Sequence, residues 1–564
     1  MDVKLAIAQS LSGATGLPAE ELAGYIETPP DPSMGDYAFP CFRLAKALKK
    51  APPAIAAELA GRLALPPGIE RAEAAGGYLN FFADKADLAG KIISRALAEG
   101  DAYGGADIGR GGNVCIDFSS INIAKPFSIA HLPTTAIGHA LSRIYRALGY
   151  RVIGINHLGD WGTQFGKMIV AYKLWGENKP VEESTVRELV RLYVRFHEEA
   201  EKDGSLNDEA RKWFRKIEQG DPEAIGLWQR FKDLTLKEVG EVYKLLGITF
   251  ESYAGESFYE DKMQAVIDEL DDKGLLVVDN GAKIVDLSEW NMPPFLIVKT
   301  DGATLYATRD LAAACYRKKT YDFVKSLYVV AYQQNLHFRQ LFKVLELMGR
   351  DWAKDCEHVN FGMVSMEEGT LSTRHGNVVY LEDVLNASIE KTLEIIKEKS
   401  PDLENREEAA RAVGVGAIVW GVLYNGRIKD TSFSWAKVLN FDGETGPYAQ
   451  YTHARCCSVL RKAGAYDKEG VDYSLIREES AAALVRAVAQ LPDAVKSAAE
   501  KNEPYLVARC IIDICSAFNK FYYECRILED DPKLRAARLV LTDAARQSIK
   551  NGLYLLGLEA PERM

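Results

Sequence analysis

A loop at residues 122–135 carries the side chains best suited to phosphate chemistry. Its sequence, NIAKPFSIAHLPTT, contains Lys125, Ser128 and His131 and leads into a segment with helical apolar periodicity. A loop at a helix N-terminus presents unpaired backbone N–H groups and the positive end of the helix dipole, and both favour phosphate. An imidazole beside it can stabilise charge that develops on the phosphate. The alternative is a polar turn that only caps the helix.

The segments around this loop predict a βαβ unit. Residues 112–120 (GNVCIDFSS) are predicted to form a buried strand, and residues 131–150 have apolar positions at helical spacing. The segment RVIGINHLGDWG, from residue 151, supplies another strand. Ligands usually bind beyond the carboxyl ends of the strands in such units. The loop at 122–135 is therefore expected at the ligand-binding edge of a sheet.

The pattern changes along the rest of the chain. From residue 171 to about 245 it is helical and highly charged, and strand patterns return in AKIVDL, PPFLIVKTDGATLYATRD and SLYVVAYQQ. A second α/β half, separated from the first by a helical insertion, is the simplest account. Beyond about residue 436, long amphipathic patterns predict a helical bundle. Residues 1 to about 107 predict a small mixed domain.

Length and composition limit the class of protein. A chain of 564 residues, 47% hydrophobic and 26% charged, is expected to fold into several domains. Its net charge of -11 argues against indiscriminate coating of nucleic acid, although local basic patches can hold a structured RNA. The nine cysteines form no CxxC pair, and no apolar run reaches membrane-spanning length. We therefore expect a cytoplasmic protein without membrane contact.

The loop at 122–135 also resembles a motif of a known protein family. It resembles the nucleotide-binding signature of class I aminoacyl-tRNA synthetases, in the NIAKPFHIGHLR form of the arginyl-tRNA synthetases, and the preceding DFSS is similar too. Ile129 and His131 match the signature, whereas Ser128 stands at the first His and Ala130 at the Gly. Ser128 can donate a hydrogen bond but carries no charge.

Further segments resemble the same family in the same order. GTLSTRHGNVV (369–379) is similar to the family's KMSTRxGN loop, with Thr370 and Thr373 at two lysine positions. In family members without the loop lysine, the lysine before the first signature is thought to compensate, and that residue is Lys125 here. The other matching segments are NHLGDWGTQFGK (156–167), DGATLYATRDLAAA (301–314), YVVAYQQNLHFRQ (328–340), FDGETGPYAQYTHAR (441–455) and LVLTDAARQSIKNGLYLLGLEAPERM (539–564).

The resemblance implies a multidomain α/β fold with a Rossmann-like parallel-sheet catalytic domain. A small N-terminal α/β domain that contacts tRNA is expected at 1–107. The catalytic domain is expected at 108–435, with a helical insertion at about 171–290 and the KMSKS-like loop at 369–377. An all-α helical bundle that binds the anticodon is expected at 436–564.

The implied reaction joins L-arginine to tRNA(Arg). ATP and L-arginine form arginyl-adenylate, and transfer to tRNA(Arg) then gives L-arginyl-tRNA(Arg), AMP and diphosphate. ATP is a substrate and Mg²⁺ accompanies it, while no protein-bound metal is expected. The implied partners are tRNA(Arg), L-arginine and ATP, and we expect a monomer. A chain cut before about residue 440 is expected to keep a folded α/β body that cannot charge tRNA.

The resemblance also implies which residues handle the nucleotide. The expected catalytic groups are Lys125, Ser128, His131, Ser372 and Arg374. The ATP-binding set consists of the first loop and three later positions: Asn122, Ile123, Ala124, Lys125, Pro126, Phe127, Ser128, Ile129, Ala130, His131, Leu132, His337, Met363 and Val364.

A pocket that selects arginine needs carboxylate or amide oxygens, because a guanidinium presents a rigid fork of N–H donors, and a Tyr can add an acceptor or a flat wall. Asp310 and Tyr306, four residues apart, fit this need if their segment is helical. Alternatively, Asp310 pairs with its neighbour Arg309 or caps a helix. We choose Gln334 over Gln333 because of its spacing to His337 in the motif. The implied arginine-binding residues are Asp117, Ser119, Asn122, Tyr306, Asp310 and Gln334.

The C-terminal region supplies the tRNA-binding candidates. Tyr448 and Tyr451 can stack on anticodon bases, or they can belong to the core. Arg535, Arg538 and Arg546 fall near one helical face, which would meet RNA phosphates or simply face water.

Two other readings remain open. Related class I synthetases share the nucleotide motifs, so the amino acid could differ, although Asp117 and Asp310 favour a cationic one. A non-catalytic tRNA-binding or regulatory paralogue is suggested by Ser128, Ala130 and the missing loop lysines. Aminoacylation assays with each amino acid would separate these readings.

Overall fold

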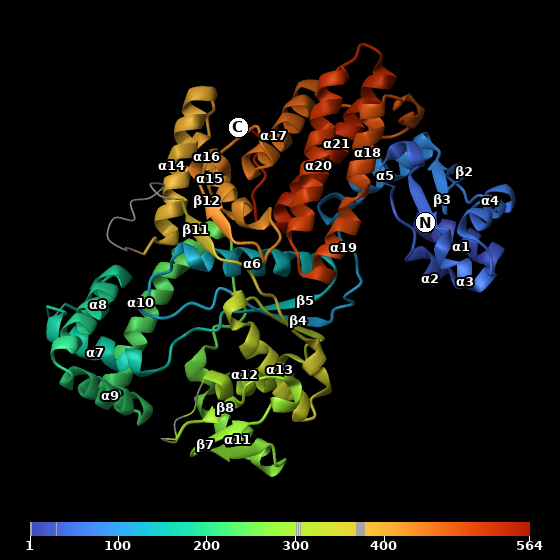
Figure 1. The fold of residues 1–564 in the computed structure, drawn as a ribbon. Coiled ribbons are helices and arrows are strands. Elements are labelled where there is room, and N and C mark those ends of the chain that lie inside the picture. The colour runs from blue at the N-terminus through green and yellow to red at the C-terminus, as the bar shows by residue number, and fades with distance from the viewer. Residues whose placement is uncertain are drawn as a thin grey trace. The chain divides into compact units, whose positions relative to one another are not determined.

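The computed structural model describes residues 3–29, 31–177, 179–300, 302, 304, 306–367 and 378–564 (Figure 1). The KMSKS-like loop predicted at 369–377, with Ser372 and Arg374, lies outside the described residues. The chain divides into two compact units. The first unit consists of Met1–Gly100, Val459–Ala489 and Ser516–Gln547, and the second of Asp101–Ser458, Gln490–Cys515 and Ser548–Met564.

The first unit contains a three-stranded antiparallel sheet of order β1-β3-β2. The sheet and its helices share one core, in which Ile7, Phe39, Leu79 and Phe81 are fully buried. The elements are α1 (Val3–Thr15), α2 (Ala19–Ala23), β1 (Tyr37–Pro40), α3 (Ala45–Leu48), α4 (Pro52–Arg62), β2 (Ile69–Ala75), β3 (Tyr78–Ala83) and α5 (Lys85–Glu99).

Helix α5 begins at a side-chain cap and joins distant parts of the first unit. The carboxylate of Asp84 accepts the N–H groups of Ala86 and Asp87, which satisfies two of the free donors of the first turn. The helix packs against α18 (Glu479–Ala489) of the same unit. Ser94 Oγ lies 3.0 Å from the hydroxyl of Tyr473.

A four-stranded parallel sheet of order β10-β9-β4-β5 forms the α/β part of the second unit (Figure 1). The predicted βαβ unit is confirmed, because β4 and β5 are parallel neighbours and α6 connects them. The carboxyl ends of β4 and β9 coincide, since Asp117 is opposite Tyr328. The elements are β4 (Asn113–Asp117), α6 (Leu132–Ala147), β5 (Arg151–Ile155), α12 (Tyr306–Tyr321), β9 (Lys325–Tyr328), α13 (Asn335–Leu347) and β10 (Cys356–His358).

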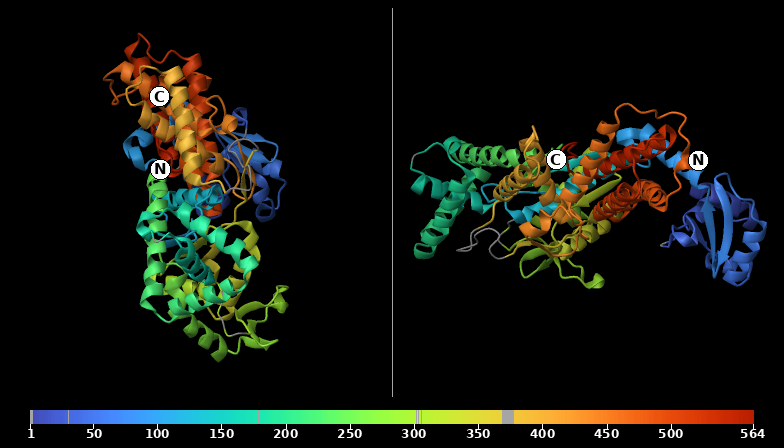
Figure 2. Two further views of the ribbon diagram at one scale, coloured as in Figure 1. Left: turned by 90° about the vertical axis from the view of Figure 1, so that its left-hand side faces the viewer. Right: turned by 90° about the horizontal axis from the view of Figure 1, so that it is seen from above.

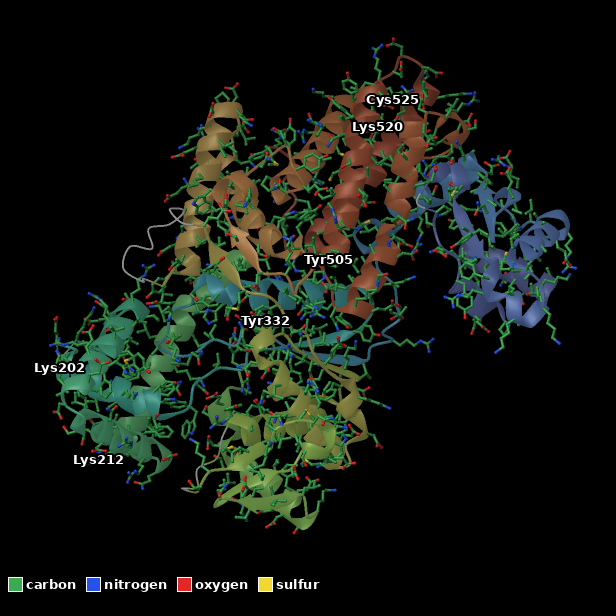
Figure 3. The ribbon with its side chains drawn as sticks, in the orientation of Figure 1. Lys202, Lys212, Tyr332, Tyr505, Lys520 and Cys525 are labelled. Atoms are coloured by element: carbon green, nitrogen blue, oxygen red, sulfur yellow. The ribbon has the colours of Figure 1, made fainter. Side chains whose placement is uncertain are left out.

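The helical insertion follows β5, and its helices between residues 163 and 246 form a group of their own in Figures 1 and 2 (teal to green), whereas the helix at 263–272 packs against α12. Lys202 and Lys212, labelled in Figure 3, pair with Glu199 and Glu209 of their own helices. The high charge of this region therefore lies in part in local surface pairs, which contribute little to stability. The helices are α7 (Thr163–Trp175), α8 (Val186–Lys202), α9 (Ser205–Glu218), α10 (Pro222–Leu246) and α11 (Met263–Asp272).

Two of the predicted strands do not join the parallel sheet. The segments AKIVDL and PPFLIV form β7 (Ala282–Val285) and β8 (Phe295–Val298), which form an antiparallel sheet with β6 (Leu276–Asp279) in the order β6-β7-β8. The segment at 306–314 is helical and begins α12. The strands at 282–298 are present as predicted, but they pair in a sheet of their own, because local periodicity identifies a strand and not its partner.

The predicted helical region is present beyond residue 436. The second unit also has a two-stranded parallel pair of β11 (Val364–Met366) and β12 (Thr431–Phe433). The helices are α14 (Leu381–Lys399), α15 (Arg406–Leu423), α16 (Trp435–Val438), α17 (Gly446–Ala463), α18, α19 (Leu491–Lys501), α20 (Tyr505–Glu524) and α21 (Pro532–Leu555).

The C-terminal segments contribute to the core of the second unit. The hydroxyl of Tyr145 on α6 lies 2.9 Å from the carbonyl of Ala499 and 2.9 Å from Asn502 Oδ1. The side chain of Gln450 donates to the carbonyl of Ala412 at 3.0 Å. A chain cut before residue 440 would lose these partners. The expectation that such a chain keeps a folded α/β body stays a prediction, and thermal unfolding of the fragment tests it.

Within the described part of the chain, no helix combines the length and the apolar character needed to span a membrane.

Candidate active site

The loop at 122–135 leads into the N-terminus of α6 beyond the carboxyl end of β4, as predicted. A 3₁₀ turn, Ile129–His131, precedes the helix, and Ser128 and His131 form a reciprocal capping box. His131 Nδ1 lies 3.2 Å from the Ser128 N–H and 3.3 Å from the Ser128 carbonyl oxygen, and the tautomer of the ring decides which of these bonds forms. Burial lowers the pKa of His131, so the neutral ring is favoured at pH 7. His131 is thus a neutral imidazole at the positive end of a helix.

Backbone pairing holds this loop beside the residues that follow the KMSKS-like segment 369–377. An antiparallel bridge joins Ser128 to Tyr380. Two backbone hydrogen bonds of 3.0 and 2.9 Å between 127–129 and 379–381 flank this bridge. The first predicted nucleotide motif and the end of the second are therefore neighbours in space, although about 240 residues separate them along the chain.

The start of the loop is fixed by the segment NHLGDWG after β5. Asn122 forms a parallel bridge with Gly159. A Cβ at Gly159 would lie 2.2 Å from Asn122 Oδ1, so any larger residue there would displace the Asn122 side chain. Lys125, in the same loop, is partly exposed. Ala130 is exposed. Most of the other apolar residues of the loop are buried, so they can contact a ligand through their backbone groups. These buried residues include Ile123, Ala124, Phe127, Ile129 and Leu132.

Asp117, an expected arginine ligand, already has internal partners. Its Oδ2 lies 2.8 Å from the guanidinium of Arg317, which is 1% exposed. Its Oδ1 accepts the hydroxyl of Ser120 at 2.7 Å. Each carboxylate oxygen thus has one internal partner and keeps further acceptor capacity, so the expectation that Asp117 also binds arginine stays a prediction.

Ser119, also an expected arginine ligand, lies in a buried polar network. It is 2% exposed, and its Oγ is 2.7 Å from the hydroxyl of Tyr243 and 3.0 Å from Thr135 Oγ1. Its backbone N–H donates to Thr134 Oγ1 at 3.0 Å. The expectation that Ser119 presents its side chain to a ligand is therefore wrong, and the residue supports the loop instead.

Asp310 is the carboxylate that retains an oxygen for a cationic ligand. Its Oδ2 lies 2.7 Å from His337 Nε2. Its Oδ1 accepts no hydrogen bond from the described residues and is 4.0 Å from His157 Nε2. Burial raises the pKa of Asp310, but the hydrogen bond from His337 and the nearby charges outweigh this and leave the pKa below its ordinary value. Asp310 is therefore ionised at neutral pH.

The alternative reading of Asp310 is not supported by its surroundings. Arg309 pairs instead with Glu260 at 2.7 Å and with Glu256 at 3.6 Å. Asp310 lies inside the first turns of α12 rather than at a cap. Tyr306, one turn earlier, is 57% exposed, and its ring centroid is 5.0 Å from that of His337.

The remaining pocket candidates lie after β9 and β10. Tyr332, labelled in Figure 3, begins a short 3₁₀ turn that carries Gln333 and Gln334, both exposed. Met363 and Val364 lie at the start of β11, and the Met363 backbone is paired with β12 through Thr431.

One of the tRNA-binding candidates has a structural role. Arg538 is 7% exposed and pairs with Glu529 and Glu478 within the first unit, so the expectation that it faces RNA or water is wrong. Arg546 pairs with Asp543 at 2.8 Å.

The other tRNA-binding candidates are more accessible. Arg535 is partly exposed and donates to the carbonyl of Ala463 at 3.0 Å. In the second unit, Tyr451 is exposed and Tyr448 is half-buried.

Sequence reasoning missed the residues that complete the pocket floor. His157 lies between Asp310 and Arg317, with Nδ1 3.4 Å from Arg317 Nη2. Burial lowers the pKa of His157, while the charge of Asp117 opposes this shift. The position of His157 at the end of a predicted strand is its one visible signal. Nothing in the local sequence marks Arg317, because its partner, Asp117, lies 200 positions earlier in the chain.

Comparisons with known proteins agree with this arrangement. Residues 92–435 match a family model described as tRNA synthetases class I (R), catalytic domain. Residues 449–564 match the DALR anticodon binding domain, and residues 1–83 the arginyl tRNA synthetase N terminal domain. The fold and the site therefore define a class I aminoacyl-tRNA synthetase.

Individual relatives narrow the class. The chain is 55% identical over 564 residues to an arginine–tRNA ligase of Clostridioides difficile (strain 630), with both chains fully covered. It is 53% identical to one of Halothermothrix orenii, over 97% of each chain. The Thermus thermophilus arginyl-tRNA synthetase structure superposes with a TM-score of 0.84 at 26% identity, covering 100% of this chain and 99% of that one. The chain belongs to the arginyl-tRNA synthetase family.

Proposed function

We propose that this chain is an arginine–tRNA ligase. It activates L-arginine with ATP to arginyl-adenylate and then transfers the arginyl group to tRNA(Arg), with AMP and diphosphate as the other products. The observation that carries the choice of arginine is the partly buried, ionised Asp310, whose Oδ1 has no donor among the described residues. A cationic side chain is the ligand that such a carboxylate selects.

Arginine binds through residues of α12 and the turn after β9. Asp310 Oδ1 accepts the guanidinium, while His337 holds the other carboxylate oxygen and fixes its orientation. Tyr306 supplies a flat wall, and Gln334 and Asn122 supply amide oxygens. Asp117, whose charge is balanced by Arg317, is proposed to accept the ligand with its remaining acceptor capacity.

Activation takes place at the loop before α6. The arginine carboxylate attacks the α-phosphorus of ATP in line, so that one P–O bond forms as the bond to the diphosphate leaving group breaks. The N–H groups at the start of α6, together with His131 Nε2 and Lys125, stabilise the negative charge on the phosphate oxygens. Ser128 orients the imidazole of His131. Ser372 and Arg374 are proposed to act on the same phosphates.

The ATP-binding set extends from this loop to the end of the sheet. Adenine and ribose would lie along the loop, whose buried apolar residues offer backbone groups, and against His337, Met363 and Val364. Mg²⁺ is expected to enter with ATP as part of the substrate. The described residues contain no group of three or more His, Cys, Asp or Glu that could hold a metal ion.

Transfer to tRNA completes the reaction. The class implies attack by the 2′-hydroxyl of the terminal ribose on the adenylate carbonyl. The exposed Tyr451 is a candidate to stack on an anticodon base, and Arg535 and Arg546 are candidates for phosphate contacts. The chain is proposed to act as a monomer in the cytoplasm, and size-exclusion chromatography with light scattering tests the oligomeric state.

Aminoacylation of total tRNA with each radiolabelled amino acid tests the proposal. We expect charging with arginine alone. Charging with another amino acid would support a synthetase of different specificity, and tRNA binding without charging would support a non-catalytic paralogue. Ser128→His tests the altered signature, because a large gain in activity would mean that the native loop is impaired.

A further inference from the structure

The backbone of the nucleotide-binding loop is held by two hydroxyl groups from the helical insertion. We propose that Thr235 and Tyr243 on α10 are positioning residues that set the conformation of residues 119–124 for catalysis. This inference rests on the proposed function, since the conformation that they hold is that of the ATP-binding loop. It assigns the insertion a role in activation of the amino acid.

The loop needs outside support because its backbone adopts an unfavourable conformation. Ser119, Ser120 and Ala124 have φ angles of 68°, 41° and 56°. Side chains other than glycine rarely adopt this left-handed region, and each such residue costs on the order of 1–3 kcal/mol unless the surrounding structure holds it in place. Three such residues within six positions indicate a loop whose shape is imposed by its neighbours.

Tyr243 supports the first part of the loop. Its hydroxyl lies 2.7 Å from Ser119 Oγ and accepts the side-chain N–H of Asn156 at 2.8 Å. Because that hydroxyl accepts from Asn156, its own proton is free to be donated to Ser119. Burial raises the pKa of Tyr243, so the phenol stays protonated. The chain of bonds therefore joins α10 to the residues after β4 and after β5.

Thr235 supports the second part of the loop. Its Oγ1 accepts the backbone N–H of Ala124 at 3.1 Å and donates to the carbonyl of Phe231 at 2.8 Å. Thr235 is fully buried, so water cannot replace it at Ala124. Lys125 follows Ala124 directly, and the bond from Thr235 thus fixes the origin of the side chain proposed to contact phosphate.

Helical geometry lets one helix supply both contacts. Thr235 and Tyr243 are eight residues apart on α10 and project from the same side of the helix. The same face carries Phe231 and Val239, both buried. Tyr243 also packs its ring against Phe127 of the loop, with centroids 5.6 Å apart. The face of α10 is thus a template for the loop from Ser119 to Phe127.

Substitutions that remove only a hydroxyl test the proposal. Tyr243→Phe and Thr235→Val keep shape and burial, and Thr235→Ser keeps the hydroxyl and serves as the conservative rescue. Tyr145→Phe removes a buried phenol that makes two hydrogen bonds elsewhere. Thr392→Val removes a buried hydroxyl that donates to the carbonyl four residues earlier. These two variants are matched controls for the general cost of losing such groups.

Two measurements are made on each variant: ATP–diphosphate exchange in the presence of tRNA(Arg), and thermal unfolding. We expect Tyr243→Phe and Thr235→Val each to lower kcat by roughly tenfold or more, because small misplacements of reacting groups can cost up to about 100-fold. The KM for arginine should change little. The controls and Thr235→Ser should stay near the native rate, although the controls should lower the melting temperature as much as the test variants do.

Several outcomes would overturn the inference. Test variants that match their controls in kcat would show that the hydroxyls matter for folding alone. The same would follow if Thr235→Ser lost as much activity as Thr235→Val. If Tyr243→Phe did not fold, the Thr235 series would decide by itself. Failure of the unaltered chain to charge tRNA would refute the proposed function, whereas normal charging with unaffected variants would refute only the role of α10.

Discussion

Replacing Asp310 with asparagine is expected to damage the use of arginine more than any other single change in the pocket. The substitution Asp310→Asn keeps the size of the side chain and removes its charge. In the native chain Oδ2 lies 2.7 Å from His337 Nε2, and Oδ1 has no donor among the described residues. The variant would keep a polar group toward His337 but would offer the guanidinium no negative charge.

The size of the effect follows from the burial of this carboxylate. Breaking a buried ion pair from one side costs roughly 3–5 kcal/mol, because the remaining charge is left without a partner. The Asp310 side chain is 26% exposed, so solvent screens part of the interaction and the lower value applies. A loss of about 3 kcal/mol corresponds to a decrease of roughly 100-fold in kcat/KM for arginine.

The assay is ATP–diphosphate exchange with tRNA(Arg) present, in which arginine and ATP are varied separately. We expect the KM for arginine to rise while the KM for ATP is unchanged. Asp322→Asn is the matched control, since Asp322 lies just after the same helix, is 88% exposed and has a φ of 44° that suits asparagine. An unchanged kcat/KM for arginine in a folded Asp310→Asn protein would refute the assignment of the pocket.

Three further predictions concern catalysis and stability. Lys125→Ala should lower kcat by roughly 100-fold, as expected for loss of one electrostatic contact made in the transition state, and unchanged steady-state turnover would contradict this. Gly138→Ala should destabilise the fold by about 3 kcal/mol, because its Cβ would lie 2.2 Å from Phe118 Cγ, whereas Gly240→Ala meets open space and should stabilise by roughly 1 kcal/mol in denaturant unfolding. Burial, with two nearby arginines, lowers the pKa of His139 to about 3. The unfolded chain therefore binds its proton first, so stability falls as the pH decreases below about 6.5, by roughly 2 kcal/mol between pH 7 and 5. His139→Gln should remove that part of the pH dependence, and an identical pH profile would count against it.

The sequence alone predicts those features of the structure that depend on interactions between residues close together in the chain. The βαβ unit around 122–135 follows from strand and helix periodicities with a polar loop between them, and the structure has these elements in that order. The position of Asp310 one turn after Tyr306 depends only on helical spacing, which α12 confirms. The capping of the 3₁₀ turn before α6 by Ser128 and His131 likewise involves residues only three positions apart. Family membership also rests on such short ordered segments.

Tertiary structure alone decides which polar groups are available to a ligand. Asp117 and Asp310 look equivalent in sequence, but Arg317, 200 positions from Asp117, pairs with the first carboxylate, whereas Oδ1 of the second has no donor among the described residues. Sequence reasoning assigns Ser119 and Arg538 to ligands, whereas the fold places both in buried networks of their own. A carboxylate or hydroxyl has the same chemistry in either case, and only its partners determine which role it has.

Local sequence patterns also do not predict which strands pair or which unit each C-terminal helix joins. Periodicity predicts strands at 282–298, yet pairing with β6 places them in an antiparallel sheet of their own. The helices beyond residue 436 are expected to form a separate body, but segments at 490–515 and 548–564 belong to the unit that contains the parallel sheet. Amphipathic patterns specify that an apolar face must be buried. They do not specify which surface covers that face, because burial against any complementary apolar surface lowers the free energy in the same way. The partner surface is determined by the fold of the whole chain.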